Sequence, residues 1–214
     1  MNDFESLDFL GEESADNGGR KNRKSEELEK ILKLEEEAKK SFDPENLEEI
    51  INFYFDNNEY EKALSYVNVF LDIYPYSTEA WHKKALILDS LGKFEEALEY
   101  FDKAILLDPT DTEILINKGI TLDNSDKFDL AIDCFNKAIE LEPENPDAVF
   151  NMGLTYEKME KFVEAAECFE NVLKIDKEHK DAYYELGYCF DFLDMMKESI
   201  AAYDQHLVYS PMNY

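Results

Sequence analysis

The side chains of this chain that could do chemistry are dispersed along it. Its three histidines, His82, His179 and His206, each lack a second histidine or a cysteine at the spacing that a metal site needs. Glu178 and Asp181 stand near His179, which is a weak signal for a metal site. We therefore predict a surface or interface role for each histidine, and no histidine-based metal or acid–base centre.

The cysteines and one acidic loop are equally poor candidates. Cys134, Cys168 and Cys189 form no CxxC pair, so we interpret them as small packing residues in a reducing compartment. The stretch 123–129 resembles a calcium loop, but Phe128 stands where glycine is required and Cys134 where the closing glutamate is required. The glycines after residue 24 form no phosphate-binding loop. We predict no enzyme, no cofactor and no metal.

The charge of the chain excludes one class of partner. Its 214 residues include 50 acidic and 22 basic side chains, a formal net charge of -28. Nucleic-acid affinity rests mainly on neutralising phosphates with Lys and Arg, so we expect no nucleic acid and a basic or amphipathic partner instead. The first eight residues have neither a basic start nor a continuous apolar run. No signal peptide or membrane span is predicted, and a cytoplasmic location is the default expectation.

The secondary-structure elements that must position any site recur with a period of 34 residues. Successive copies begin at Pro44, Thr78, Thr112, Pro146 and Lys180. A small residue recurs in register at Ala63, Ala97, Ala131, Ala165 and Ser199. Four residues later comes a bulky one, at Val67, Phe101, Phe135, Phe169 and Tyr203. The copies close with Pro75, Pro109, Pro143, Lys177 and Pro211.

Each copy is predicted to be a helical hairpin. In the second copy, apolar residues fall at helical spacing on both sides of the short turn Leu91–Phe94. Gly119, Gly153 and Gly187 lie inside the first helices, where glycine costs about 1 kcal/mol relative to alanine. Their presence predicts a close approach of the facing helix. The prolines stand at junctions between copies, where a missing backbone donor does least harm.

These residues carry a resemblance to a known family. The second copy shows it best, in Trp81, Ala85, Leu88, Gly92, Phe94, Ala97, Phe101, Ala104 and Pro109. This pattern resembles the tetratricopeptide repeat, and the match runs from Pro44 to Tyr214. The resemblance implies an all-α, right-handed solenoid of five hairpins, with repeats at 44–77, 78–111, 112–145, 146–179 and 180–213.

Two segments precede the array, which spans 44–214. Residues 1–24 form an acidic stretch that ends in the basic cluster Arg20–Lys24. We expect a flexible tail there; the alternative is a short binding motif, or a basic latch for an acidic groove of the same or a neighbouring molecule. Residues 25–43 are predicted to form an amphipathic N-terminal capping helix. Its apolar side comprises Leu28, Ile31, Leu32, Leu34 and Ala38.

The other end of the array has no recognisable cap. Solenoids need covered ends for solubility, so either the chain is a fragment of a longer array or another subunit covers its last helix. We expect a fragment.

The resemblance also implies where a ligand binds, because first helices line a concave groove in this family. The predicted groove residues are Asn52, His82, Lys83, Leu86, Ile116, Asn117, Ile120, Phe150, Asn151, Leu154, Tyr184 and Tyr188, with an acidic rim at Glu45, Glu79, Glu113, Asp147 and Asp181. The groove is polar toward its N-terminal end and apolar toward its C-terminal end. Asn117 and Asn151 are predicted to hydrogen-bond the backbone of an extended peptide. The basic clamp that some family members use for a terminal carboxylate is missing.

These observations favour an interaction scaffold that binds a protein or peptide segment. One alternative is an assembly module that associates with itself through its C-terminal end. Another is the regulatory arm of a longer enzyme.

Overall fold

A computed structural model describes residues 26, 28–38 and 43–210 of the chain. These residues fall into two compact units, one up to Ile73 and one from Tyr74 onward, and each is described by itself. The predicted tail of residues 1–24 and the closing Pro211 lie outside the described residues. All regular structure within the described residues is helical.

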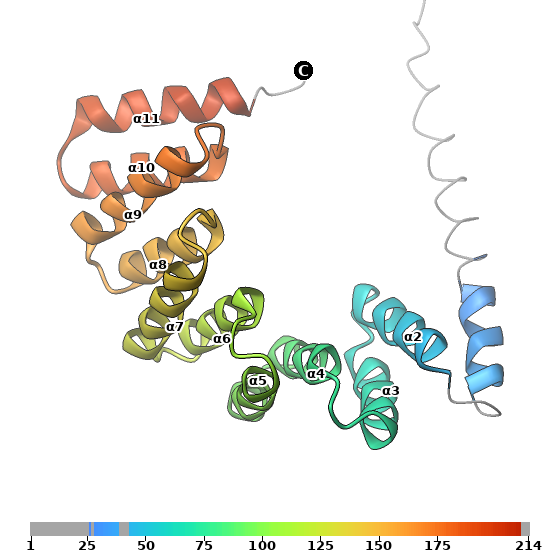
Figure 1. The fold of residues 1–214 in the computed structure, drawn as a ribbon. Coiled ribbons are helices and arrows are strands. Elements are labelled where there is room, and N and C mark those ends of the chain that lie inside the picture. Colours follow the sequence, from blue (N-terminus) through green and yellow to red (C-terminus); the bar gives the residue numbers. More distant parts are fainter. Residues whose placement is uncertain (1–25, 27, 39–42, 211–214) are drawn as a thin grey trace, which may run out of the picture. The chain divides into compact units, whose positions relative to one another are not determined.

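The helices follow one another in pairs joined by short turns (Figure 1). The first unit contains α2 (Pro44–Asp56) and α3 (Tyr60–Ile73). The second contains α4 (Thr78–Ser90), α5 (Phe94–Leu107), α6 (Thr112–Asn124), α7 (Phe128–Leu141), α8 (Pro146–Lys158), α9 (Phe162–Ile175), α10 (Lys180–Phe192) and α11 (Met196–Tyr209). The two helices of each pair pack against each other, and within the second unit each pair packs against the next. This confirms the predicted succession of helical hairpins.

The start of each first helix is capped by a side chain. A side-chain oxygen or nitrogen accepts a hydrogen bond from a backbone N–H of the first turn, which otherwise has no partner within the helix. The capping residues recur every 34 positions at Asp43, Ser77, Asp111, Asn145 and His179. His179 does this through Nδ1, 3.1 Å from the nitrogen of Ala182. Its role is therefore structural.

The turn inside each hairpin has one residue in the left-handed region. Its φ lies between 57° and 69° at Asn58, Gly92, Asp126, Glu160 and Asp194. Glycine adopts this conformation freely, and Asn and Asp adopt it more readily than most other residues. Glycine occupies this position in one hairpin, and the other four form the same turn with Asn, Asp or Glu.

The core of the second unit is built on the predicted aromatic row. Phe101, Phe135 and Phe169 are completely buried. The helix glycines lie directly against this row, because a Cβ added at Gly153 would stand 2.7 Å from a ring carbon of Phe169. The predicted close approach of the facing helix is therefore confirmed. The residue that approaches each glycine is the aromatic one, which stands one turn after the small residue of the repeat.

In the first unit, helical residues 28–38 lie against α2 and α3. Ile31 and Ala38 are buried, whereas Leu28 and Leu32 are exposed. The Glu35 carboxylate accepts hydrogen bonds from the hydroxyls of Tyr54 and Tyr66, at 2.7 and 2.8 Å. The rings of these two tyrosines stack, with centroids 5.9 Å apart. Lys30 forms an ion pair with Glu49 of α2.

The second unit follows a curve. Figure 1 shows α4, α6 and α8 on its inner side and α5 and α7 on its outer side. The first helices of the hairpins therefore present one face to the hollow of this unit, and the predicted site residues of α4 to α10 stand on these helices.

Candidate peptide-binding surface

The predicted surface residues lie on one face of each first helix, because they stand at positions i, i+1 and i+4 of a helical turn. His82, Ile116, Phe150 and Tyr184 occupy the first of these positions in α4, α6, α8 and α10. Three of their rings lie against the core aromatic of the same hairpin. The centroid distances are 5.9 Å for His82 and Phe101, 5.5 Å for Phe150 and Phe169, and 5.7 Å for Tyr184 and Tyr203. The core thus fixes the orientation of this row.

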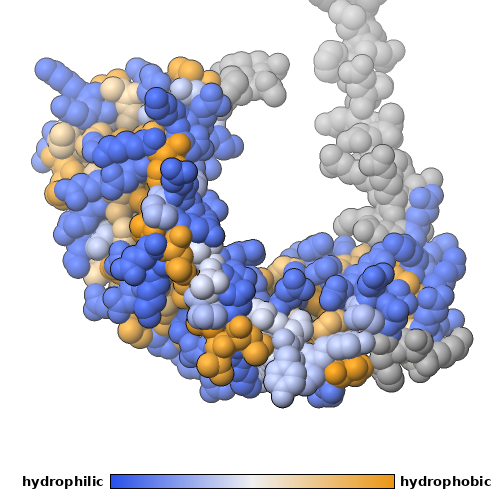
Figure 2. All heavy atoms as spheres, in the orientation of Figure 1, coloured by the Kyte–Doolittle hydropathy of each residue, from blue (hydrophilic) through white to orange (hydrophobic). Residues whose placement is uncertain are grey.

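The exposure of this row changes along the unit. Ile116 is buried, Phe150 is half-buried and Tyr184 is exposed. Phe150 also contacts the imidazole of His179, with centroids 4.9 Å apart. The C-terminal first helices therefore offer more aromatic surface than α6 does. Figure 2 shows apolar side chains over α8 to α10, interrupted by hydrophilic ones.

The two asparagines that the sequence treats as equivalent have different partners. The Asn117 amide lies 3.0 Å from Nε2 of His82, which joins α6 to α4. Burial lowers the pKa of His82, which favours the neutral ring, the form whose Nε2 can accept a hydrogen bond from this amide. The Asn151 amide donates instead to the backbone oxygen of Asp147 in its own helix, at 2.8 Å. Each amide has a second N–H and a carbonyl oxygen with which it can bind a ligand.

The row at i+4 is apolar throughout the second unit. Ile120 and Leu154 pack against the buried clusters of their hairpins, and Leu86 is half-buried. Tyr188 is exposed, and its ring lies 4.8 Å from that of Phe192. Lys83, the remaining predicted residue of this unit, is half-buried.

Asn52 belongs to the first unit. It lines a shallow pocket there, together with Ile31, Glu48, Glu49 and Asp56. Three of these side chains are acidic, so this pocket is polar and negatively charged.

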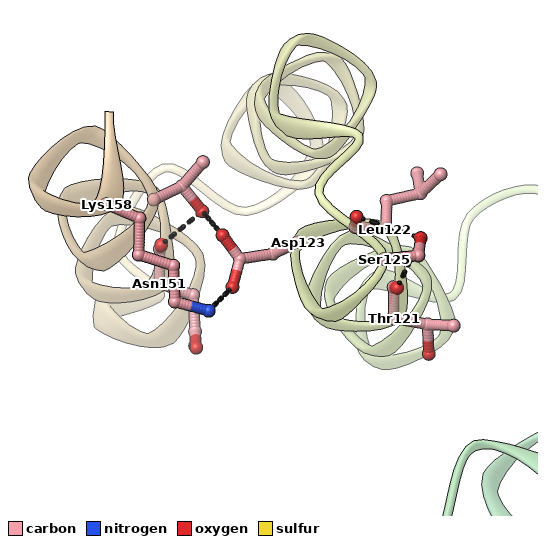
Figure 3. Close-up of polar contacts among 7 residues, drawn as sticks. Thr121, Leu122, Asp123, Ser125, Asn151 and Lys158 are labelled. Carbon is pink, nitrogen blue, oxygen red and sulfur yellow. Dashed lines mark hydrogen bonds and ion pairs between the residues drawn. The ribbon is translucent and has the colours of Figure 1, made fainter. Parts of the chain in front are cut away.

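An acidic row on the same face was not predicted from the sequence. It comprises Asp89, Asp123, Glu157 and Asp191, three residues beyond the i+4 row in α4, α6, α8 and α10. Figure 3 shows Asp123 extending from α6 toward α8, where it accepts a hydrogen bond from Thr155 at 2.9 Å and forms an ion pair with Lys158. The sequence contains this signal, because an acidic residue recurs at this position at 34-residue intervals from the second copy onward.

The next member of the acidic row has different surroundings. Glu157 accepts a hydrogen bond from the Cys189 thiol at 3.2 Å. The residue of α10 that is equivalent to Lys158 of α8 is the apolar Phe192. Burial raises the pKa of Glu157 to about 7, and the charge of Glu185 adds to this effect. The pKa of Glu185 is raised as well, mainly by burial and further by Asp181. A positively charged group of a ligand would therefore stabilise the ionised form of these two carboxyl groups.

The three cysteines lie in the interior of the hairpins. They are free and buried, and burial raises the pKa of Cys168 to about 12, so its reactive thiolate form is suppressed. Among the described residues, no group of His, Cys, Asp and Glu is arranged to hold a metal ion. Within the same part of the chain, every helix is too short or too polar to cross a bilayer.

The recurring caps, turns and glycine–aromatic contacts define a class of protein, the helical-hairpin repeat proteins. The family model described as "Psidin, N-terminal TPR repeats region" matches residues 45–185. The chain belongs to this family of tetratricopeptide repeats.

Solved structures agree with this fold. MamA (residues 41 to the end) from Desulfovibrio magneticus RS-1 superposes with a TM-score of 0.70 at 20% identity, over 79% of this chain and 97% of that one. Pseudomonas aeruginosa pilF gives 0.70 at 22% identity, over 79% and 78%. YrrB, described as a TPR protein with an unusual peptide-binding site, gives 0.62 at 20% identity, over 84% and 93%. No curated protein matches the sequence.

Proposed function

We propose that this protein is a non-enzymatic interaction scaffold that binds a basic or amphipathic peptide segment on the first helices of its hairpins. The observation that carries the proposal is one continuous face on α8 and α10. There, apolar and aromatic side chains such as Phe150, Leu154 and Tyr184 stand next to the raised-pKa carboxyls Glu157 and Glu185. Apolar side chains of a ligand would bury against the former, and its lysines or arginines would neutralise the latter.

The same proposal takes the array to be a right-handed solenoid of five hairpins in which residues 25–43 form the N-terminal cap. The buried Ile31 and the Glu35 hydrogen bonds to Tyr54 and Tyr66 support the cap. The proposed setting is the cytoplasm, where free and buried thiols stay reduced.

Random peptides displayed on phage, selected on the immobilised chain, test the proposed ligand class. We expect the selected peptides to be rich in Lys or Arg next to apolar residues. Synthetic copies are then titrated by fluorescence anisotropy against a variant that carries Phe150→Asp and Tyr184→Asp. Because both changes place a charge on the proposed contact surface, we expect affinity to fall by about tenfold or more.

The matched control carries Leu130→Asp and Val163→Asp, which put the same charges on exposed apolar positions of α7 and α9. We expect its affinity to stay within about twofold of the parent, as for substitutions outside an interface. Asn117→Ala combined with Asn151→Ala should weaken binding by several-fold through lost hydrogen bonds. Equal affinities of the surface variant and the control, or selected peptides that are acidic, would contradict the proposal.

A further inference from the structure

Helix α11 has an uncovered apolar stripe. Met196, Ile200 and Leu207 lie on one side of the helix at i, i+4 and i+11, and they are 73%, 56% and 53% exposed. A different side, about a quarter of a turn or more around the helix, is buried against α10 through Ser199 and Ala202. The stripe is therefore distinct from the side that holds α11 in its own hairpin.

The repeat register shows what normally covers this stripe. One repeat earlier, its counterparts are Phe162, Ala166 and Leu173 of α9, and α10 packs against them. Ala166 is only 6% exposed, and the Phe162 ring stacks on Phe192 with centroids 4.3 Å apart. The stripe on α11 is thus the side of a second helix that accepts an antiparallel helix. Nothing in the described part of the chain occupies it.

The charges beside the stripe are self-complementary. Lys197 and Asp204 lie two turns apart on the same exposed flank of α11, and their midpoint falls near Ile200 and Ala201. The midpoint of Met196 and Leu207 falls one residue further on, a shift of about 1.5 Å along the helix. A twofold axis near these two midpoints would bring Met196 close to Leu207 of a second copy, and each Lys197 close to an Asp204.

We propose that α11 pairs antiparallel with α11 of a second copy of this chain, through the Met196, Ile200 and Leu207 stripe and two symmetric ion pairs between Lys197 and Asp204. A parallel arrangement would instead bring Asp204 beside the buried Ser199, which offers no charge. The self-complementary charges favour a second copy over an unrelated helix as the occupant. The proposal is independent of the peptide-binding surface, since α11 carries none of its residues.

Sedimentation velocity over a concentration series of the full chain tests the pairing. We expect the parent to shift from monomer to dimer as its concentration rises, and Ile200→Glu to remain monomeric. The matched control is Ala201→Glu, which adds the same charge at an exposed position on a different side of the same helix. It should dimerise to within about threefold of the parent, as expected for a substitution at a rim or outside the contact.

Charge reversal tests the orientation of the pair. Lys197→Asp alone and Asp204→Lys alone each turn two attractions into repulsions, so each should weaken dimerisation by roughly three- to tenfold. The double variant with both changes should return to within about threefold of the parent. Circular dichroism of each variant verifies that the helices are retained. A parent that stays monomeric at all concentrations, a dimer that tolerates Ile200→Glu, or a double variant that is not restored would overturn the proposal.

Discussion

At the scale of single residues, the acidic row shows how one position in the repeat acquires different chemistry. Asp123 is paired with Lys158 and accepts a hydrogen bond from Thr155, so its negative charge has close partners. Glu157 occupies the same position one repeat on, but the group that donates a hydrogen bond to it is a thiol, and its neighbour Glu185 is acidic. Burial raises the pKa of Glu157, and the charge of Glu185 adds to this effect.

The raised pKa of Glu157 predicts a pH-dependent stability. The folded chain holds this proton more tightly than the unfolded chain, whose carboxyl keeps the ordinary value of 4.5. The stabilisation is therefore complete below about pH 4.5 and is lost as the pH rises through about 7. Glu157→Gln should raise the free energy of unfolding at pH 8 by about 1–2 kcal/mol, a figure reduced for solvent screening.

Urea unfolding at pH 5 and pH 8 measures this effect. The gain from Glu157→Gln should shrink toward zero at pH 5, where the native carboxyl is also neutral. Glu170→Gln removes one negative charge from an exposed position of α9 and so controls for the change in net charge. An equal gain from both variants at pH 8 would show that general repulsion, and not the surroundings of Glu157, is responsible.

At the scale of elements, the three hairpins from α6 to α11 each contain a close contact between a glycine in the first helix and an aromatic ring in the second. Gly119, Gly153 and Gly187 all have a ring within 3 Å of the position where a Cβ would stand. The intrinsic helix propensity of these positions is poor, and packing outweighs it. The turn position at Gly92 is different, because nothing lies within 4 Å and φ is +69°.

Substitution at these two kinds of glycine should therefore have different effects. Gly153→Ala should lower the free energy of unfolding by about 1–2 kcal/mol, because the strain of overpacking exceeds the gain in helix propensity. Gly92→Asn should change it by about 0.5 kcal/mol or less, since asparagine tolerates the left-handed conformation. Chemical denaturation monitored by circular dichroism compares them. If Gly153→Ala stabilised the chain, the close contact with Phe169 would not restrict this helix.

At the scale of the whole molecule, the net charge of -28 governs association. A basic ligand is attracted by this field before it reaches the surface, and dissolved salt screens the attraction over about 8–10 Å at 0.10–0.15 M ionic strength. Two copies of the chain repel each other through the same field. The apolar stripe of α11 must overcome this repulsion for the pair to form.

Salt should therefore weaken the binding of a basic peptide. Between 50 and 500 mM NaCl we expect its affinity to fall by roughly tenfold, mainly through a slower association rate. Stopped-flow fluorescence at several salt concentrations resolves the two rates. A salt-independent affinity would indicate that apolar contacts alone hold the ligand, and that Glu157 and Glu185 take no part.

The 34-residue period by itself determined the hairpins, their short turns and the buried aromatic row. The reason is that each copy repeats the helical spacing of its apolar residues and the small and bulky residues that pack together. It also placed every predicted surface residue of α4 to α10 on one helix face. Only the tertiary structure distinguished the amide of Asn117, which reaches His82, from that of Asn151, which bonds to its own helix. It alone showed that the α11 stripe is uncovered while its counterpart on α9 is not. The physical reason is that register fixes where a side chain points, whereas its burial, partners and pKa depend on what the neighbouring helix brings to it.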